Sequence, residues 1–109
     1  MIQVIVYKRN KKCIGFESIG HAGYDDAGLD IVCSAVSILT INTMNAIEQF
    51  TDDDFSQVSD ETEAKIEFKI KGEVSREAAL LLDAMVLGLQ TLADDDNYNH
   101  YVDVTYEEV

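Results

Sequence analysis

The residues most able to do chemistry gather in one short segment, Gly20–Ser37, which reads GHAGYDDAGLDIVCSAVS. The chain has two histidines and two cysteines, and one of each, His21 and Cys33, falls here. A cysteine thiolate is a strong nucleophile, and a neighbouring histidine can take the thiol proton. The segment therefore predicts one of two things: nucleophilic cysteine chemistry, or a structural turn that leads into a helix.

The residues around Cys33 favour the start of a long helix. Apolar residues recur with helical spacing over Leu29–Phe50, where only Asp30 and Glu48 carry charge. We expect Asp30 to cap this helix, which would make Cys33 its third residue. Unpaired N–H groups and the positive end of the helix dipole would then lower the pKa of Cys33 and offer donors to an oxyanion. A second role for Asp30 stays open, that of orienting His21.

Three glycines, Gly20, Gly23 and Gly28, predict a loop over Gly20–Gly28. Glycine adopts backbone conformations closed to other residues and lets a ligand approach the backbone closely. Such a loop is long enough to fold back and place His21 beside the helix start.

The remaining candidates have structural alternatives. Ser37 lies one turn after Cys33 on the same helix face, where it would either line a pocket or bond to a helix carbonyl. Cys13 and His100 lie in strand-like segments with no motif around them, and we interpret both as structural. The two cysteines lack the spacing of a zinc site, and a disulfide is not expected in a cytoplasmic chain.

The elements that must position these residues alternate between strand and helix patterns. Ser75 predicts the N-cap of a second, leucine-rich helix that closes at Asp94–Asp96. Strand patterning occurs in Ile2–Lys8, Cys13–Ile19, Ala64–Lys71 and Tyr101–Tyr106, and Gln57–Ser59 is compatible with a further short strand. The order β-β-α-β-α-β predicts an α+β fold with a mostly antiparallel sheet and two helices, in a single domain over residues 1–109.

The charge and composition of the chain limit the kinds of partner that we expect. A net charge of −13 repels phosphate backbones and anionic membranes and attracts basic proteins, so we expect no direct nucleic-acid partner. The basic run Lys8–Lys12 (KRNKK) fits a solvated hairpin tip, with a small nucleic-acid anchor as the alternative. No apolar run is expected to reach the length of a membrane span, and the basic residues of the N-terminus follow the apolar ones, the reverse of a signal peptide, so we expect a cytoplasmic protein.

The pattern G-H-A-G-Y, a short variable stretch, then G-x-D-I-V-C-x-A-V-S closely resembles the signature of the ribosomal-processing cysteine proteases, the Prp family. The resemblance implies a homodimeric α+β cysteine protease without a cofactor. Its substrate would be a basic large-subunit ribosomal protein, number twenty-seven, from which it removes an N-terminal extension. The family's nucleophile falls on Cys33 and its base on His21, while the motif Asp and Ser fall on Asp30 and Ser37. Its mobile glycine-rich loop falls on Gly20–Gly28.

Two departures from the family pattern concern the same segment. Ser34 stands where the family often has alanine, and Asp25 and Asp26 make the loop more acidic than expected. Neither removes a catalytic group.

Two other classes of function fit the same residues. An acidic domain can hold a basic ribosomal protein or an assembly factor without cutting it. A metal site built from His21, Cys33 and Asp30 is the third hypothesis, although a helix start does not by itself supply enough ligands.

Overall fold

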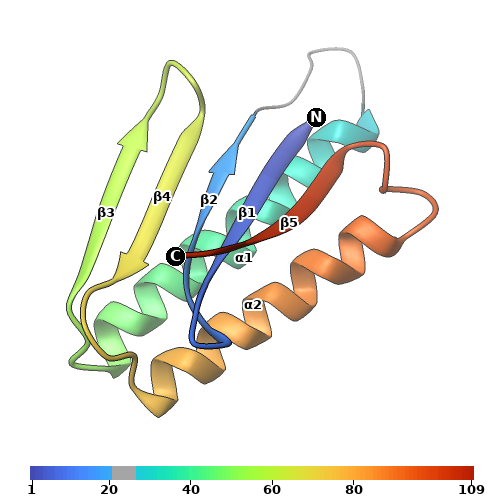
Figure 1. Ribbon diagram of the computed structural model, residues 1–109. Helices are drawn as coiled ribbons and strands as arrows, with labels where there is room; N and C mark the ends of the chain where they lie inside the picture. The colour runs from blue at the N-terminus through green and yellow to red at the C-terminus, as the bar shows by residue number, and fades with distance from the viewer. Residues whose placement is uncertain (21–26) are drawn as a thin grey trace.

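The computed structural model describes residues 1–20 and 27–109, with side chains in the second stretch from Asp30 onward. These described residues form five strands and two helices (Figure 1). They are β1 (Ile2–Arg9), β2 (Lys12–Ile19), α1 (Ala27–Phe50), β3 (Phe55–Asp60), β4 (Lys65–Ile70), α2 (Arg76–Asp94) and β5 (Val102–Glu108).

The strands form one mixed sheet in the order β3-β4-β2-β1-β5. Only β1 and β5 pair in parallel, and the other three pairings are antiparallel. The α+β class and the mostly antiparallel sheet are thus confirmed. The short strand near Gln57–Ser59 is real and longer than its pattern suggested, because β3 covers Phe55–Asp60.

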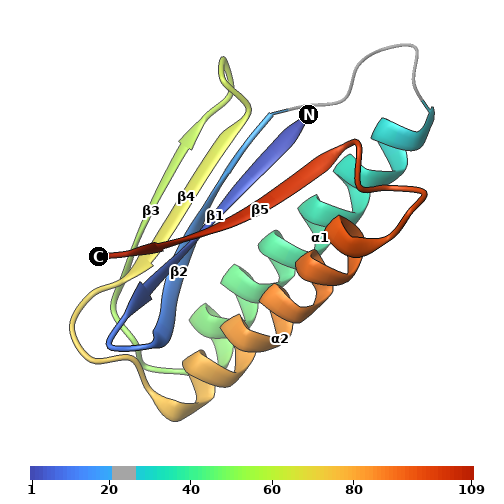
Figure 2. The same cartoon turned by 45° about the vertical axis from the view of Figure 1, so that its right-hand side comes forward.

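Both helices cover the same face of the sheet (Figure 2). Strand side chains alternate between the two faces, so every second residue of β1 points at the helices. The core is formed by these strand residues together with the inward stripes of α1 and α2. Its largest fully buried side chains include Phe16, Phe68, Ile2, Ile47, Leu82, Met85 and Leu89.

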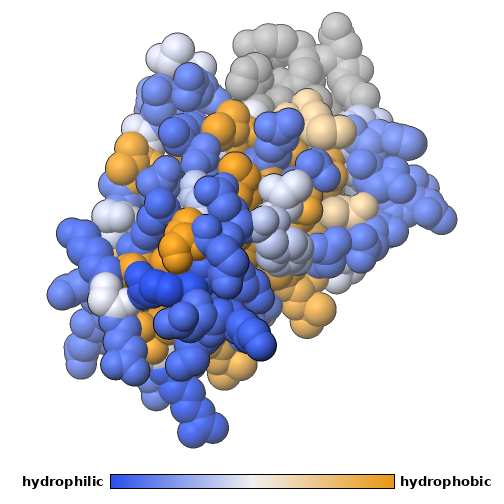
Figure 3. Space-filling model, viewed as in Figure 1, coloured by the Kyte–Doolittle hydropathy of each residue, from blue (hydrophilic) through white to orange (hydrophobic). Residues whose placement is uncertain are grey.

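The other face of the sheet is open to solvent and mostly hydrophilic, as Figure 3 shows in the view where the sheet lies in front of the helices. Its polar side chains support one another. Tyr7 donates a hydrogen bond of 2.7 Å to Glu17, and the ammonium of Lys69 lies 4.4 Å from the centre of the Tyr7 ring. Burial, with the hydrogen bond and the negative charge of Glu17, raises the pKa of Tyr7 well above its ordinary value.

The basic run Lys8–Lys12 forms the predicted hairpin tip between β1 and β2. Asn10 and Lys11 both adopt positive φ, 52° and 68°, as a tight two-residue turn between twisted strands requires. The guanidinium of Arg9 donates to the carbonyl of Gly72, so the tip is tied to the loop that precedes α2.

The helix α1 corrects one expectation. Within the described residues, one helix, Asp30–Phe50, is long and apolar enough to cross a membrane by length and composition. In this fold the same helix lies on the face of the sheet beside α2 (Figure 2), and Val32, Val36 and Ile47 on its inner face are buried in the common core. This is the environment of a core helix in a globular domain.

The start of α2 is held by two side chains. Ser75 is the N-cap, as predicted, and its hydroxyl accepts the N–H of Ala78 at 3.0 Å. Asp53, in the loop before β3, accepts the N–H of Ser75 at 2.8 Å. Although burial disfavours its charge, the hydrogen bonds from Ser75 and Thr51 lower the pKa of Asp53. The carboxylate therefore links the end of α1 to the start of α2.

We expect the substitution Asp53→Ala to lower the free energy of unfolding at pH 7 by about 1–2 kcal/mol, because it removes a hydrogen bond to a charged acceptor. The folded-state pKa of Asp53 lies below its ordinary value of 3.8, so this stabilisation is complete above 3.8 and is lost as the pH falls through the lower folded value. Urea unfolding of wild type and variant should show a difference in the free energy of unfolding. This difference should shrink as the pH falls below 3.8. Asp52→Ala, an exposed neighbour, is the control, and an equal loss in both variants would contradict the assignment.

Candidate active site

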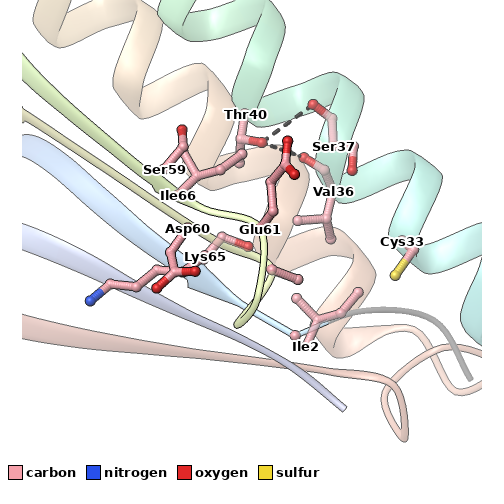
Figure 4. Close-up of a pocket in the computed structure, with 13 residues that line it drawn as sticks. Ile2, Cys33, Val36, Ser37, Thr40, Ser59, Asp60, Glu61, Lys65 and Ile66 are labelled. Atoms are coloured by element: carbon pink, nitrogen blue, oxygen red, sulfur yellow. Dashed lines mark hydrogen bonds between the residues drawn. The ribbon is translucent and has the colours of Figure 1, made fainter.

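Cys33 lies on the flank of α1 and lines a pocket of about 350 Å³. Figure 4 shows its sulfur at one end of this pocket, between the helix and the far end of the sheet. The thiol is half-buried and is not part of a disulfide. The pocket thus places a polarisable nucleophile atom beside a hollow that a ligand can enter.

The pocket is built where four parts of the fold meet: α1, the start of β1, the end of β2 and the turn between β3 and β4. Its floor is largely apolar, and its mouth carries carboxylates. The lining residues are Ile2, Ser18, Gly20, Cys33, Val36, Ser37, Thr40, Ser59, Asp60, Glu61, Ala64, Lys65 and Ile66.

Gly20 closes one corner of the pocket, and only glycine suits its place. Its φ is +119°, and a Cβ there would lie 2.7 Å from the carbonyl oxygen of Met1. Its N–H donates to the carbonyl of Ala64 at 3.3 Å, which holds the end of β2 against the β3–β4 turn. The expectation of a special backbone at Gly20 is therefore confirmed.

The start of α1 differs from the prediction. The helix begins at Ala27, so Gly28 belongs to its first turn and not to a loop, and Asp30 lies inside the first turn and is not the N-cap. Cys33 is consequently the seventh residue of the helix. In an α-helix the N–H at that position bonds to the carbonyl four residues earlier, so it is not free to hold an oxyanion.

The pKa of Cys33 also departs from the expectation. Burial and, next, the negative charge of Asp30 raise the pKa of the thiol, and the amino terminus of the chain opposes them. Asp30 acts on Cys33 because residues three apart share a helix face. The described groups therefore favour the thiol, whereas a helix start would favour the thiolate.

Ser37 lies one turn further along α1 and lines the pocket, which is the first of its two predicted roles. The hydroxyl that bonds back to the helix belongs instead to Thr40, which donates to the carbonyl of Val36 at 2.8 Å and approaches that of Ser37 at 3.3 Å. Thr40 is fully buried and so forms a polar but satisfied part of the pocket wall.

His21 and Gly23 lie outside the described residues, so the predicted pairing of His21 with Cys33 stays a prediction. Across residues 1–20 and the part of the chain after the gap, no three His, Cys, Asp or Glu side chains gather as a metal ion would require. The metal hypothesis, which needs His21, therefore has no support from the remaining groups.

Cys13 and His100 lie away from the pocket. Cys13 is buried in β2, its sulfur 3.6 Å from the carbonyl of Gly15, and burial raises its pKa, as suits an inert core thiol. His100 is exposed in the turn before β5 and not in a strand, with its ring 6.5 Å from that of Tyr101. The structural interpretation of Cys13 holds.

The β3–β4 side of the pocket had no signal in the sequence. Asp60, Glu61 and Ile66 line the same pocket as Cys33 only because the hairpin returns beside α1, and no local motif predicts that they share it. The stretch 51–63 is acidic in sequence, and only the tertiary fold brings Ser59, Asp60 and Glu61 from it to the pocket.

The fold and the pocket define a small α+β domain with a cysteine thiol beside a partly apolar hollow. The family model described as cysteine protease Prp matches residues 1–103. The ribosomal processing cysteine protease Prp of Bacillus subtilis is 29% identical over 102 residues, which cover 87% of this chain and 89% of the relative. The chain therefore belongs to the cysteine protease Prp family.

Two solved structures of an essential ribosomal processing protease Prp from Staphylococcus aureus share this fold. One, in complex with a covalently linked product peptide, has a TM-score of 0.85 and 27% identity, and the match covers 98% of this chain and 100% of that one. The other, in complex with a substrate peptide, has a TM-score of 0.88 and 26% identity over the same shares of each chain. The activity of the chain is thus that of a cysteine protease, a hydrolase.

We expect Asp30→Asn to lower the pKa of Cys33, because the substitution removes a nearby negative charge. Alkylation of Cys33 by iodoacetamide at neutral pH should then be faster in the variant, and the pH midpoint of its rate should move down. Peptide mass spectrometry separates Cys33 from buried Cys13. Glu48→Gln, on the same helix but far from the thiol, should leave the rate unchanged, and an unchanged or slower rate in Asp30→Asn would contradict the electrostatic cause.

Proposed function

We propose that this chain is an endopeptidase that removes the N-terminal extension of a large-subunit ribosomal protein, number twenty-seven, and so supports ribosome maturation. The observation that carries the proposal is the position of Cys33, whose sulfur lies at the wall of the 350 Å³ pocket in a chain of this protease family. The relatives from Staphylococcus aureus and Bacillus subtilis are ribosomal processing cysteine proteases, which supports the substrate class.

The proposed chemistry uses a dyad of Cys33 and His21. Because the described surroundings raise the pKa of Cys33, the resting thiol needs a base at the moment of attack. His21 takes the thiol proton, and the sulfur attacks the carbonyl carbon of the scissile peptide bond. Collapse of the tetrahedral intermediate breaks the C–N bond, and the histidine returns the proton to the leaving amine. Water then hydrolyses the thioester, which releases the second product and restores the thiol.

The pocket suits the acyl half of such a substrate. Ile2, Val36 and Ile66 give it apolar walls, which match an aromatic or aliphatic side chain near the cut. Ser37 lines the same pocket one helical turn from the sulfur, within reach of a peptide backbone group.

The charge of the chain supports a basic substrate. A net charge of −13 draws a basic ribosomal protein toward the enzyme at long range and raises the rate of encounter, with an effect that falls as salt rises. We further propose that the protein acts as a cytoplasmic homodimer, in keeping with the resemblance of its motif. Light scattering of the purified protein tests the dimer.

The experiment uses a synthetic peptide that spans the extension and the mature start of ribosomal protein twenty-seven from the same organism. We expect wild type to make one cut, and Cys33→Ala and His21→Ala to lower kcat/KM by about 10³-fold or more, because each removes an essential member of the dyad. Mass spectrometry of the products locates the cut.

Two matched controls separate chemistry from folding. Ser34→Ala changes the residue next to the nucleophile, and His100→Ala removes the other histidine, and both should keep wild-type rates. Cleavage by Cys33→Ala would contradict the proposal. Binding of the peptide without a cut by any folded variant would favour the acidic binding module instead.

A further inference from the structure

Glu61, in the turn between β3 and β4, places a carboxylate at the mouth of the Cys33 pocket. In Figure 4 its side chain runs from the hairpin toward α1, on the side where Ser37 and Thr40 line the pocket. The backbone of the turn is fixed, since the carbonyl of Glu61 accepts the N–H of Ala64 at 3.2 Å. The carboxylate thus belongs to a hydrogen-bonded turn and points across the mouth of the Cys33 pocket toward α1.

This carboxylate has no cation to pair with among the described side chains. The one ion pair found in that part of the molecule joins Lys65 to Glu17 at 3.8 Å. Lys65 is the cation that lines the pocket, and its ammonium is therefore engaged on the open face of the sheet. The neighbouring Asp60 is also occupied, because its Oδ1 accepts the N–H of Thr62 at 2.9 Å.

The position of Glu61 relative to Cys33 defines which part of a substrate it meets. Ser37 and Thr40 lie four and seven residues after Cys33, and a helix rises about 1.5 Å per residue, so they are about 6 and 10 Å further along. An extended peptide advances about 3.3 Å per residue. For a substrate that lies extended along α1, a side chain opposite Ser37 and Thr40 therefore belongs to the second or third residue from the scissile bond.

We propose that Glu61 determines specificity, by pairing with a lysine or arginine side chain two or three residues from the bond that is cut. The inference rests on the proposed function, since it takes Cys33 as the attacking atom. It goes beyond general attraction between an acidic protein and a basic one, because it assigns a single carboxylate to a single substrate position.

The expected effect is modest and depends on salt. An ion pair at a partly exposed pocket mouth changes affinity by about three- to tenfold. The Debye length falls from about 10 Å at 0.1 M salt to about 3 Å at 1 M, so the preference should weaken over that range.

The test measures binding to the Cys33→Ala variant, so that affinity is recorded without turnover. The probes are peptides that span the mapped cut of ribosomal protein twenty-seven, in which each of the three residues on either side of the bond is in turn lysine or its uncharged analogue norleucine. At one position, the second or third from the bond, the lysine peptide should bind three- to tenfold tighter than the norleucine peptide. Adding Glu61→Gln should abolish that difference, and Glu61→Lys should reverse it in favour of glutamate at the same position.

The matched control is Glu63→Gln, which removes an exposed carboxylate from the same turn that does not line the pocket. It should leave the lysine preference intact. Equal affinities at every position, a preference that survives Glu61→Gln, or no measurable binding would overturn the inference. Failure of the proposed function is distinguishable, because it appears as cleavage by Cys33→Ala or as no cleavage by the wild type, and neither depends on the charge at residue 61.

Discussion

The packing of α1 against the sheet is the constraint on which the site depends. A stripe of residues one helical turn apart, Val32, Val36 and Thr40, is almost fully buried, and this fixes the rotation of the helix about its axis. Cys33 follows Val32 by one position, about 100° around the helix, and so lies on the flank of the stripe. It is half-buried there and turned toward the end of the β3–β4 hairpin. A helix rotated by one residue would bury the thiol or expose it to solvent.

The same packing explains why the pocket has two chemical halves. Its inner wall is made by core residues such as Val36, Ile66 and Ile2, which continue the apolar interior of the domain. Its outer wall is the β3–β4 turn, which is exposed at the edge of the sheet and therefore carries charge. Lys65 could neutralise this rim, but its ammonium pairs with Glu17 on the opposite face of the sheet. The negative charge at the mouth consequently stays available to a ligand.

The fold was largely predictable, because hydrophobic periodicity reports burial directly. The alternation in residues 64–71 gave β4, and the leucine stripe after Ser75 gave α2 with its cap. The start of α1 was predicted wrongly. Asp30 is a good capping residue in isolation, but the helix extends back to Ala27, which leaves Asp30 in the first turn and Cys33 in the second. Capping preferences are local, whereas the point where a helix starts depends also on the chain that leads into it.

The candidate site was predictable only in part, for the same reason. Cys33 stood out because few residue types can act as nucleophiles, and Ser37 followed from helical spacing. The environment of Cys33 was not predictable: burial and Asp30 raise its pKa, where a helix-start position would have lowered it. Glu61 and Ile66 come from a hairpin far along the chain, and only the tertiary fold brings them to the pocket. The role of His21 stays a prediction from the motif.

The claim that Cys33 is the nucleophile of this pocket is tested most directly with a peptide halomethyl ketone. Its sequence ends at the residue before the mapped cut, so that it alkylates the attacking atom. We predict a mass increase of one reagent on the peptide that contains Cys33, in step with the loss of peptidase activity, and protection by added substrate. Inactivation with the label on any other residue, or full labelling of Cys33 with activity retained, would contradict this account.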